Sequence, residues 1–551
     1  MGADMDSDRD RSRERNLGPD LDLEQARRAT KQEHALSLTD ALRTYRKSVA
    51  WSMLFSLAII MEGYDTTLLP SFFAFPAFVR KYGSPIYTTT AAGSGAVELT
   101  RHELTAAWQS GLSNGAYVGE IFGLIITGLL SERLGYRRTM AGATLSLAGF
   151  IFVLFFAENL PTLLVGEILC GIPWGVFQTV TTAYAAEVCP VALRGCLTTY
   201  VNLCWVIGQF IATGVLRGFL HREDEWSYRI PFALQWVWLP FILVSVLLGP
   251  ESPWWLVRKG RVAEAREVLT RLHHTSSKTP AAAKKAETEL DNTLALMVYT
   301  SEMEKRLSVT QSSYTFLDCF RSTDLRRTEI TCITWAIQAL CGSSFMGYST
   351  YFYQQAGLDV SQSFNMSLGQ YGFGVVGTVF SWVLMTRFGR RSLYVSGLAA
   401  LVTILFAVGF TSFSDTTAAS WAIGSLLLVF TFTYDCTIGP VCYSIVAEIP
   451  STQMRAKTIV LGRNVYNMFM IMNGVIVPRM LNPTAWDWKG RTGFFWAGIT
   501  VALFQWTYFK LPETRNRTFA EMDMLFERKV SARHFRDTQV SIGDEQARAT
   551  D

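Results

Sequence analysis

Charged residues are scarce in this sequence of 551 residues: Asp, Glu, Lys and Arg make up only 17% of it, whereas 49% is hydrophobic. The charges are also unevenly spread, because long apolar stretches alternate with polar ends and loops. This composition excludes a soluble globular enzyme and a disordered chain. A net charge of +4 is too small to indicate a nucleic-acid partner, so none is expected.

Recognisable sites of covalent chemistry are missing as well. None of the nine cysteines has the spacing of a zinc site, and most lie in or beside apolar runs, which is typical of small buried thiols. No catalytic serine, metal-ligand cluster or phosphate-binding loop is apparent. The sequence therefore predicts neither an enzyme nor an ATP-driven pump, and it implies no cofactor, no metal and no obligate protein partner.

Apolar runs dominate what is present. Since a membrane-spanning helix needs about 20 predominantly apolar residues, the sequence predicts an all-α integral membrane protein with twelve transmembrane helices. The expected spans are 49–70, 107–130, 139–157, 162–182, 197–216, 232–249, 329–352, 367–386, 392–411, 420–442, 457–478 and 492–510. Short loops on one side carry most of the basic residues, which stay cytoplasmic, so both termini are expected in the cytoplasm. These loops are 131–138, 189–196, 387–391 and 450–457.

Three local patterns occur twice, once in each half of the chain. They are Glu187-x6-Arg194 and Glu448-x6-Arg455, Pro250-Glu251-Ser252 and Pro512-Glu513-Thr514, and Arg133-Leu134-Gly135 and Arg387-Phe388-Gly389. Two parallel six-helix repeats are typical of transporters that rock around a central site. The predicted division is a disordered N-terminal tail (1–47), a six-helix half (48–250), cytoplasmic linker helices (251–328), a second six-helix half (329–511) and a C-terminal tail (512–551).

The repeated charges lie at predicted helix ends on the cytoplasmic side. Glu and Arg residues seven apart could latch neighbouring helices when an inner gate is shut. Alternatively, the arginines only follow the positive-inside rule. The candidate gate residues are Arg133, Glu187, Arg194, Glu251, Arg387, Glu448, Arg455 and Glu513.

Six ionisable residues fall inside predicted spans, where a charge is costly and marks a functional site by default. They are Glu62, Asp65, Glu120, Glu167, Asp435 and Arg463. Glu62 and Asp65 are three residues apart and share a helix face, and two close carboxylates in a low dielectric cannot easily both be ionised. All six histidines fall outside the spans, so carboxylates would have to carry any transported proton. Asp65 is the leading candidate, and a static ion pair with Arg463 is the alternative.

Amides and aromatic rings gather in the same spans. Uncharged amides can bond hydroxyl groups, and rings can cover the C–H faces of a sugar, so the set suits a neutral, hydroxyl-rich ligand. Each residue could instead serve only as an interhelical hydrogen-bond partner. The predicted ligand residues are Gln209, Gln338, Ser344, Tyr348, Tyr443, Tyr466 and Asn467.

Several motifs over about residues 40–530 resemble those of the sugar porter family of the major facilitator superfamily. They include Gly63-Tyr64-Asp65-Thr66, Arg133-Leu134-Gly135-Tyr136-Arg137-Arg138, Pro250-Glu251-Ser252-Pro253-Trp254-Trp255-Leu256, Gly439-Pro440-Val441 and Pro512-Glu513-Thr514-Arg515-Asn516-Arg517-Thr518. A finer match is similar to the fungal maltose/α-glucoside permeases. It rests on the segments 166–175 (GEILCGIPWG) and 200–209 (YVNLCWVIGQ).

The resemblance implies the major facilitator fold and proton-coupled import of α-linked sugars across the plasma membrane by alternating access. The implied partners are the sugar, protons and membrane lipid. It assigns sugar-binding positions to Gln209, Gln338, Ser344 and Tyr443 and to the pair 466–467. It also assigns the coupling position to Asp65.

Two departures from the family pattern affect these expectations. Ala339 stands where a second glutamine is usual, and Glu167 replaces the arginine that usually pairs with the aspartate of span 1. We therefore expect Asp65 to share a proton with Glu62 or Glu167, with Arg463 supplying the missing positive charge. The alternatives are facilitated transport of a hexose or another neutral polyol-like compound, and a sensor that binds sugar without moving it.

Overall fold

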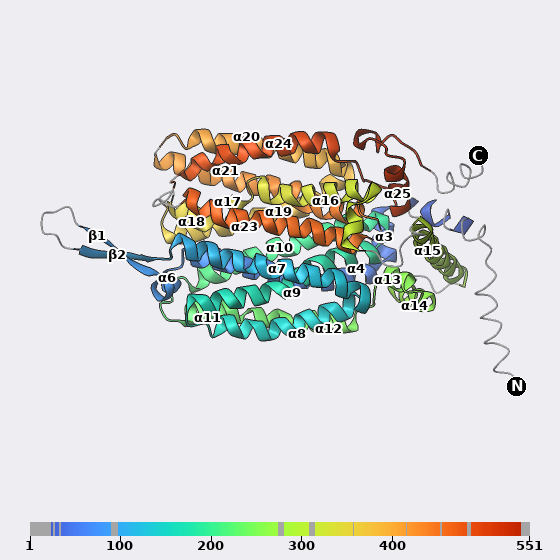
Figure 1. The fold of residues 1–551 in the computed structure, drawn as a ribbon, viewed down its shortest axis with the longest axis horizontal. Helices are drawn as coiled ribbons and strands as arrows, with labels where there is room; N and C mark the ends of the chain where they lie inside the picture. Colours follow the sequence, from blue (N-terminus) through green and yellow to red (C-terminus); the bar gives the residue numbers. More distant parts are fainter. Residues whose placement is uncertain are drawn as a thin grey trace.

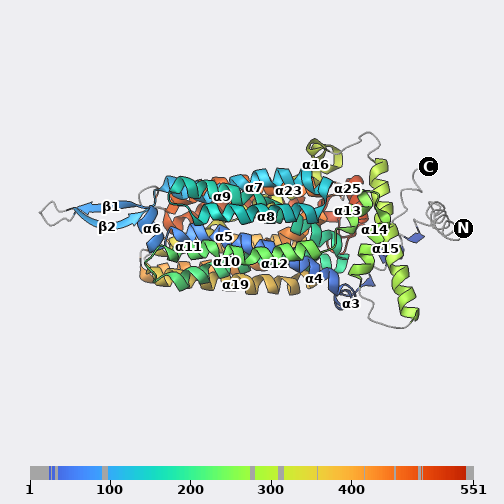
Figure 2. The same cartoon turned by 90° about the horizontal axis from the view of Figure 1, so that it is seen from below.

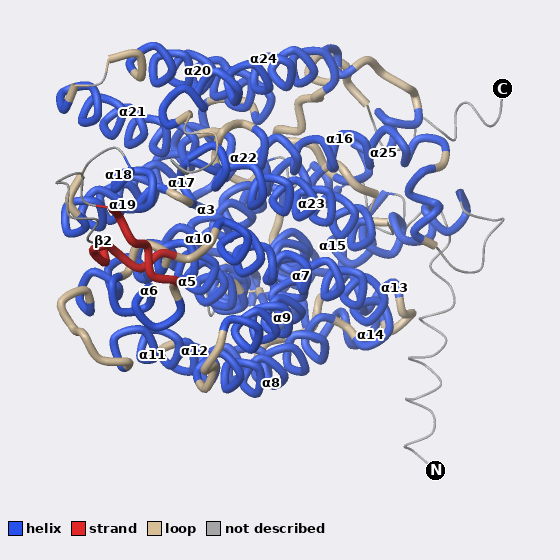
Figure 3. The backbone as a smooth tube through the Cα atoms, turned by 60° about the vertical axis from the view of Figure 1, so that its left-hand side comes forward, coloured by secondary structure: helices blue, strands red, loops and turns tan. Residues whose placement is uncertain are grey.

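The structure is a computed structural model that describes residues 24–25, 28–31, 35–89, 97–273, 280–307, 315–355, 358–414, 416–451, 454–481, 486 and 488–540. Long helices form one elongated bundle (Figure 1). A two-stranded sheet projects from one end (Figure 1), and within the part of the chain that the structure describes it is the only sheet among the helices (Figure 3). Most of the predicted disordered tail over residues 1–47 lies outside the described residues.

Every predicted span coincides with a single helix or with consecutive short helices. The single helices are α7 (Ala106–Leu134), α8 (Tyr136–Phe155), α9 (Leu160–Val188), α10 (Val191–Phe219), α19 (Val360–Arg387), α20 (Arg390–Thr411), α23 (Arg455–Leu481) and α24 (Thr492–Lys510). Within the described part of the chain, eight helical segments are long and apolar enough to cross a membrane by length and composition alone. The four predicted spans outside these eight segments, which are 49–70, 329–352, 457–478 and 492–510, do not meet these criteria.

Four spans are interrupted. They are α4 and α5 (Arg46–Phe55, Leu57–Phe72), α11 and α12 (Trp226–Ala233, Gln235–Leu248), α16, α17 and α18 (Ser322–Leu340, Ser344–Gly347, Ser349–Gln355), and α21 and α22 (Thr417–Cys436, Ile438–Glu448). Two breaks have clear causes. Gly342 after α16 has φ 92°, a left-handed conformation that glycine adopts without a steric penalty. Pro440 cannot donate to the carbonyl of Cys436, so α21 does not continue into α22.

The bundle consists of two halves that meet along two seams. We call α4–α12 the N-terminal half and α16–α24 the C-terminal half. Helix α7 packs beside α23, and α10 packs beside α19 and α22. Hydrogen bonds of 2.8 Å join α10 to α19 at two levels, from Arg217 to Asn365 and from Trp382 to Thr199. The exact boundaries of the halves, linker and tails stay predictions.

Smaller elements cover both ends of the bundle. One end carries α6 (Pro76–Tyr82) and the antiparallel strands β1 (Ser84–Thr89) and β2 (Val97–Glu103). The other end carries α3 (Leu38–Thr44), α13 (Pro253–Arg258), α14 (Val262–Leu272), α15 (Pro280–Leu307), η1 (Phe316–Phe320), α25 (Phe519–Glu527) and η3 (Ala532–His534). Helix α15 runs across this end (Figure 2). The 3-10 turn η2 (Lys489–Arg491) precedes α24. The hairpin was not predicted, although Ile86, Tyr87, Thr88 and Thr89 form a run typical of a strand.

Glycines allow α5, which carries Glu62 and Asp65, to approach α10 closely. A Cβ atom built on Gly208 of α10 would lie 2.1 Å from the carbonyl oxygen of Ile60. One built on Gly63 of α5 would lie 2.3 Å from the carbonyl oxygen of Trp205. Small residues of this kind let membrane helices pack backbone to backbone. The position of α5 against α10 therefore depends on this pair.

We expect Gly208→Ala to lower the yield of monodisperse protein and its melting temperature in detergent, because a backbone carbonyl cannot move aside cheaply. Gly142→Ala is the matched control, since a Cβ atom there meets nothing within 4 Å and alanine favours a helix by about 1 kcal/mol over glycine. Equal melting temperatures for the two variants would contradict the close-packing argument.

Candidate functional site

A cavity of about 120 Å³ lies between the two halves. Helices α5, α7, α9 and α10 line it from the N-terminal half, and α16, α17, α21, α22 and α23 line it from the C-terminal half. A single water needs only about 10–15 Å³ measured in this way. The cavity is therefore large enough to hold several water molecules.

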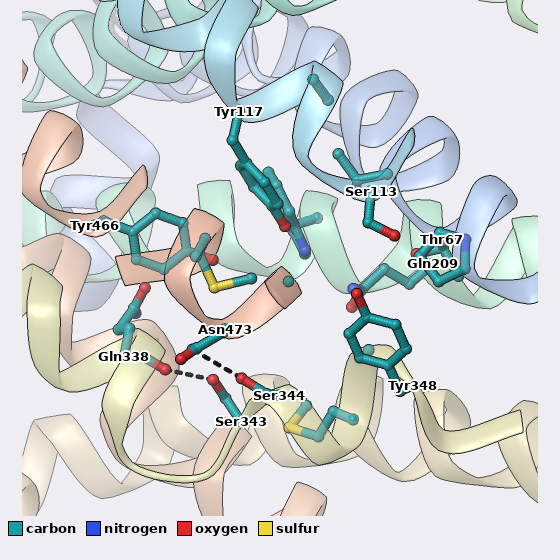
Figure 4. A pocket seen from close by; sticks show the side chains of 18 of the residues that line it. Thr67, Ser113, Tyr117, Gln209, Gln338, Ser343, Ser344, Tyr348, Tyr466 and Asn473 are labelled. Atoms are coloured by element: carbon teal, nitrogen blue, oxygen red, sulfur yellow. Dashed lines mark hydrogen bonds between the residues drawn. The ribbon is translucent and has the colours of Figure 1, made fainter. Parts of the chain in front are cut away.

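Polar and aromatic side chains from separate helices point into this cavity (Figure 4). Six of the seven predicted ligand residues line it: Gln209, Gln338, Ser344, Tyr348, Tyr443 and Tyr466. The seventh, Asn467, is fully buried on α23 and does not belong to the lining. Its assigned role in binding sugar stays a prediction that the lining does not support.

The break between α16 and α17 is held by side chains of the cavity itself. Gln338 donates to the carbonyl oxygen of Gly439 at 2.8 Å, and the hydroxyl of Ser343 donates to the carbonyl oxygen of Gln338 at 2.5 Å. Asn473 of α23 donates to the Ser344 hydroxyl and to the carbonyl oxygen of Ala339, both at 2.8 Å (Figure 4). These bonds give the irregular backbone the partners that a membrane interior requires.

Asn473 lines the cavity but was missed in the sequence. Its spacing of seven residues from Tyr466 corresponds to two helical turns, which places both residues on one face of α23. This spacing could have identified Asn473 from the sequence. Ser113 and Tyr117 of α7 also line the cavity and were missed; their spacing of four residues carried the same information.

Asp65 and Glu167 form one pair of buried acids beside the cavity. Both line it, and their exposed fractions are only 1% and 2%. The side-chain amide of Gln235 on α12 donates to Asp65, and the two carboxyl groups interact electrostatically. Among the ion pairs recorded for the described residues, none joins a lysine or arginine to either acid. A negative charge here lacks the neutralising partner that membrane burial normally demands.

Glu62 and Glu120 form a second group, which does contain a cation. Arg463 of α23 donates through its Nε to Gln178 of α9, whose amide nitrogen donates to Glu62. Glu62 and Glu120 both interact electrostatically with Arg463. The positive charge thus lies among these two acids, whereas the sequence had suggested a role for it beside Asp65.

Aromatic rings surround the Arg463 guanidinium. Its central carbon lies 4.1 Å from the ring centroid of Tyr466, 4.7 Å from that of Trp335 and 5.6 Å from that of Trp205. Cation–π contacts are worth about 2 kcal/mol or more when they are desolvated. They help to keep a charged group stable at this depth.

Asp435 lines the cavity from α21, on the C-terminal half. Its nearest recorded partner is the amide of Asn202 on α10, at 3.5 Å, which is a weak hydrogen bond across the interface between the halves. The structure therefore places the six predicted charges in three groups. Their roles in proton coupling stay predictions.

The repeated sequence motifs form repeated structures at the end of the bundle that carries α13 and α25. Glu251 accepts hydrogen bonds from the backbone of Tyr136 and Arg137 at the start of α8, and Glu513 accepts one from the backbone of Arg390 at the start of α20. A carboxylate at a helix N-terminus satisfies free N–H groups and the helix dipole. Burial raises the pKa of Glu251, and the backbone donors partly oppose that shift.

A second repeated contact follows each of these caps. The hydroxyl of Ser252 donates to Glu187, and that of Thr514 donates to Glu448 at 2.5 Å. Arg390 also pairs with Glu448 at 3.3 Å, and Arg258 pairs with Glu187 at 3.1 Å. The four acids of the predicted gate therefore occupy equivalent places in the two halves.

Two recorded ion pairs at this end cross between the halves. Arg455 of α23 lies 3.7 Å from Glu187 of α9, and both are almost completely buried. Lys457 pairs with Glu132 of α7 across the same boundary, and Thr198 and Ser444 share a hydrogen bond of 3.1 Å. The structure brings Glu187 and Arg455 together as a latch would, but leaves Arg133 and Arg387 exposed and outside the recorded ion pairs.

Phe519 of α25 lies between two of the predicted gate arginines. Its ring centroid is 3.6 Å from the guanidinium carbon of Arg194 and 3.7 Å from that of Arg455. Trp254 of α13 packs edge-on against the same ring at 6.0 Å. Since Arg194 belongs to the N-terminal half and Arg455 to the C-terminal half, one aromatic ring joins the two.

Comparison with known families identifies this architecture. The family described as "Sugar (and other) transporter" matches residues 51–526. The chain belongs to this family. It is therefore a membrane transporter and not an enzyme, as the sequence predicted.

Relatives of this sugar transporter family member cover nearly all of the chain. It is 41% identical over 519 residues to a general alpha-glucoside permease of Saccharomyces cerevisiae, covering 94% of this chain and 81% of the relative. It is 41% identical over 521 residues to maltose permease MAL61 of Saccharomyces cerevisiae, covering 94% and 82%. Alpha-glucosides permease MPH3 of the same yeast is 42% identical over 520 residues, covering 94% and 83%.

Solved structures match the fold. The proton:xylose symporter XylE bound to 6-bromo-6-deoxy-D-glucose has a TM-score of 0.71 at 17% sequence identity, covering 88% of this chain and all of the other. That structure has the major facilitator superfamily fold. The predicted fold class of twelve transmembrane helices is therefore confirmed.

We expect Phe519→Leu to weaken the junction between the halves, because leucine keeps the apolar volume but loses the π face that contacts both arginines. A desolvated cation–π contact contributes about 2 kcal/mol or more. The melting temperature should fall, and a cysteine introduced at Ser444 should react faster with a membrane-impermeant thiol reagent in detergent. Phe519→Tyr keeps a π face and should preserve both values. Unchanged reactivity in Phe519→Leu would contradict a clamping role.

Proposed function

We propose that this protein is a proton-coupled importer of α-glucosides such as maltose, working by alternating access across the plasma membrane with both termini in the cytoplasm. The observation that carries the proposal is one cavity that combines amide, hydroxyl and aromatic side chains with an acid pair, Asp65 and Glu167, which has no recorded ion pair with a lysine or arginine among the described residues. The names of the yeast relatives, which are 41–42% identical, support the substrate class.

The neutral part of the lining explains how a sugar would be held. Gln209, Gln338, Ser344 and Asn473 offer amide and hydroxyl groups to sugar hydroxyls, and tyrosines offer rings for the C–H faces. The short side chain of Ser344 leaves space at a position where the family resemblance implies an asparagine. A second sugar ring would use that space.

The acid pair explains how a proton would be coupled to the sugar. Two carboxylates at Asp65 and Glu167 without a cation cannot both stay ionised once the cavity loses its water, so one proton is retained between them. A sugar that closes the cavity expels this water and therefore favours the protonated pair. By thermodynamic reciprocity, the protonated pair then favours bound sugar. Coupling follows from this mutual dependence.

Transport also requires the contacts between the halves to open and close. The pairs Glu187–Arg455 and Glu132–Lys457 and the Phe519 ring join the halves at the end of the bundle that carries α13 and α25. These contacts would separate when the cavity opens toward the cytoplasm. No bond of the sugar is made or broken in the cycle.

Purified protein in proteoliposomes should accumulate labelled maltose when the external solution is more acidic than the interior, and maltose should alkalinise a weakly buffered external medium. Unlabelled sucrose and trehalose should compete better than cellobiose, because the proposal specifies α-linked glucosides. Uptake without a pH change would instead indicate facilitated transport. Binding without uptake would indicate a sensor.

Asp65→Asn should abolish proton-driven accumulation while leaving maltose counterflow between equal pH values largely intact. The asparagine is isosteric but cannot carry a proton, so concentrative uptake should fall about tenfold or more, the effect of losing about 1.4 kcal/mol of coupling. Counterflow is the internal control for folding and sugar binding. Accumulation at the wild-type level would remove Asp65 from the coupling role.

A further inference from the structure

A bridge of side chains connects the two halves, and one of its members, Arg463, also lines the cavity. Arg463 of the C-terminal half donates to the side-chain oxygen of Gln178, and the side-chain nitrogen of Gln178 donates to Glu62. Gln178 and Glu62 both belong to the N-terminal half, on α9 and α5. All three residues are buried, with exposed fractions of 6%, 0% and 2% for Gln178, Glu62 and Arg463.

The amide at the centre of this bridge separates opposite charges. A glutamine accepts with its oxygen and donates with its nitrogen, so it satisfies the guanidinium and the carboxylate without their direct contact. A direct pair of Arg463 and Glu62 at this depth would keep the acid ionised, because an adjacent cation favours the charged form. A permanently ionised acid cannot carry a proton.

The other groups around Glu62 leave room for one proton. Glu120 of α7 and Arg463 interact with it electrostatically, and the hydroxyl groups of Tyr443 and Tyr466 are also within electrostatic range. With both tyrosines neutral, the two acids and one arginine carry a net charge of about −1 when both acids are ionised. One proton makes the group neutral, which is the favourable state in a membrane interior.

We propose that Gln178 is a positioning residue that spaces Arg463 from Glu62, so that the Glu62 carboxyl can take up and release a proton during the transport cycle. This inference rests on the proposed proton-coupled function and adds a residue that the family resemblance did not assign. Without the amide, Arg463 and Glu62 pair directly and the site stays ionised.

The test compares Gln178→Ala with wild type in proteoliposomes and in purified detergent-solubilised protein. Proton-driven accumulation of maltose should fall about tenfold or more, while counterflow should change less than about twofold. In acid-induced infrared difference spectra, the band of a protonated carboxyl that Glu62→Gln removes should also be lost in Gln178→Ala. A purely structural role for Gln178 would not remove that band.

Gln370→Ala is the matched control. Gln370 is also a buried amide, but its recorded partners, the hydroxyl of Tyr353 and the carbonyl of Met346, are uncharged. This variant should keep the infrared band and the wild-type ratio of accumulation to counterflow. Should Gln178→Ala not fold, Gln178→Met, which keeps the volume and removes the amide, is judged by the same two measurements.

Three results would overturn the inference. One is an equal fall in accumulation and counterflow in the Gln178 variant, and another is persistence of the Glu62 band. The third is the absence of any band that Glu62→Gln removes. Failure of the wild-type protein itself to accumulate any sugar is a different outcome, because it rejects the proposed function and this inference with it.

Discussion

The cost of an unneutralised charge in an apolar interior governs the arrangement of this protein. Each buried acid must be paired with a cation, bonded to donors or protonated. The two acid groups meet this constraint differently. Glu62 and Glu120 have a nearby arginine, whereas Asp65 and Glu167 have only the amide of Gln235 and each other. The pair of Asp65 and Glu167 is therefore stable in the closed protein only when it binds a proton. The cost of burying a charge thus links this site energetically to a proton gradient.

In the repeated motifs, hydrogen-bond donors stabilise the acids. Glu251 and Glu513 are partly buried acids that face the N-termini of α8 and α20, where free N–H groups and the helix dipole stabilise negative charge. Glu187 and Glu448 receive hydroxyl donors from the following residues, Ser252 and Thr514. Fixed hydrogen-bond donors therefore lie against all four of these acids. Burial alone therefore does not make a carboxyl group a proton carrier, because the donors and cations placed around the group also decide whether its charge is stabilised.

The fold was predictable from the sequence because membrane spans depend on local hydropathy, and all twelve expected spans coincide with helices. The repeats could also be found, because they are local patterns. Glycine and proline are known to interrupt helices, but the sequence did not indicate that the interruptions would occur at Gly342 and Pro440. Contacts between distant segments were not predictable: Phe519 reaches two arginines that lie 325 and 64 residues away only because α25 folds back under the bundle. Likewise, the rotation of α23 decides which acids Arg463 approaches, and no spacing in the sequence encodes that rotation.

The proposed sugar-binding residues and the candidate acids lie mostly in different halves. Most of the neutral residues that would contact a sugar, such as Gln338, Ser344, Tyr443 and Asn473, belong to the C-terminal half. Four of the five buried candidate acids, Glu62, Asp65, Glu120 and Glu167, belong to the N-terminal half. A sugar held mainly by the C-terminal half can still influence the acids of the N-terminal half, because residues of both halves line the same cavity. It can do so by drawing the halves together, which removes water from the acids and shifts their charge balance. Arg463 supports this argument, because it belongs to the C-terminal half but lies among acids of the N-terminal half. The electrostatic interaction between Arg463 and these acids therefore depends on how the two halves are positioned relative to each other.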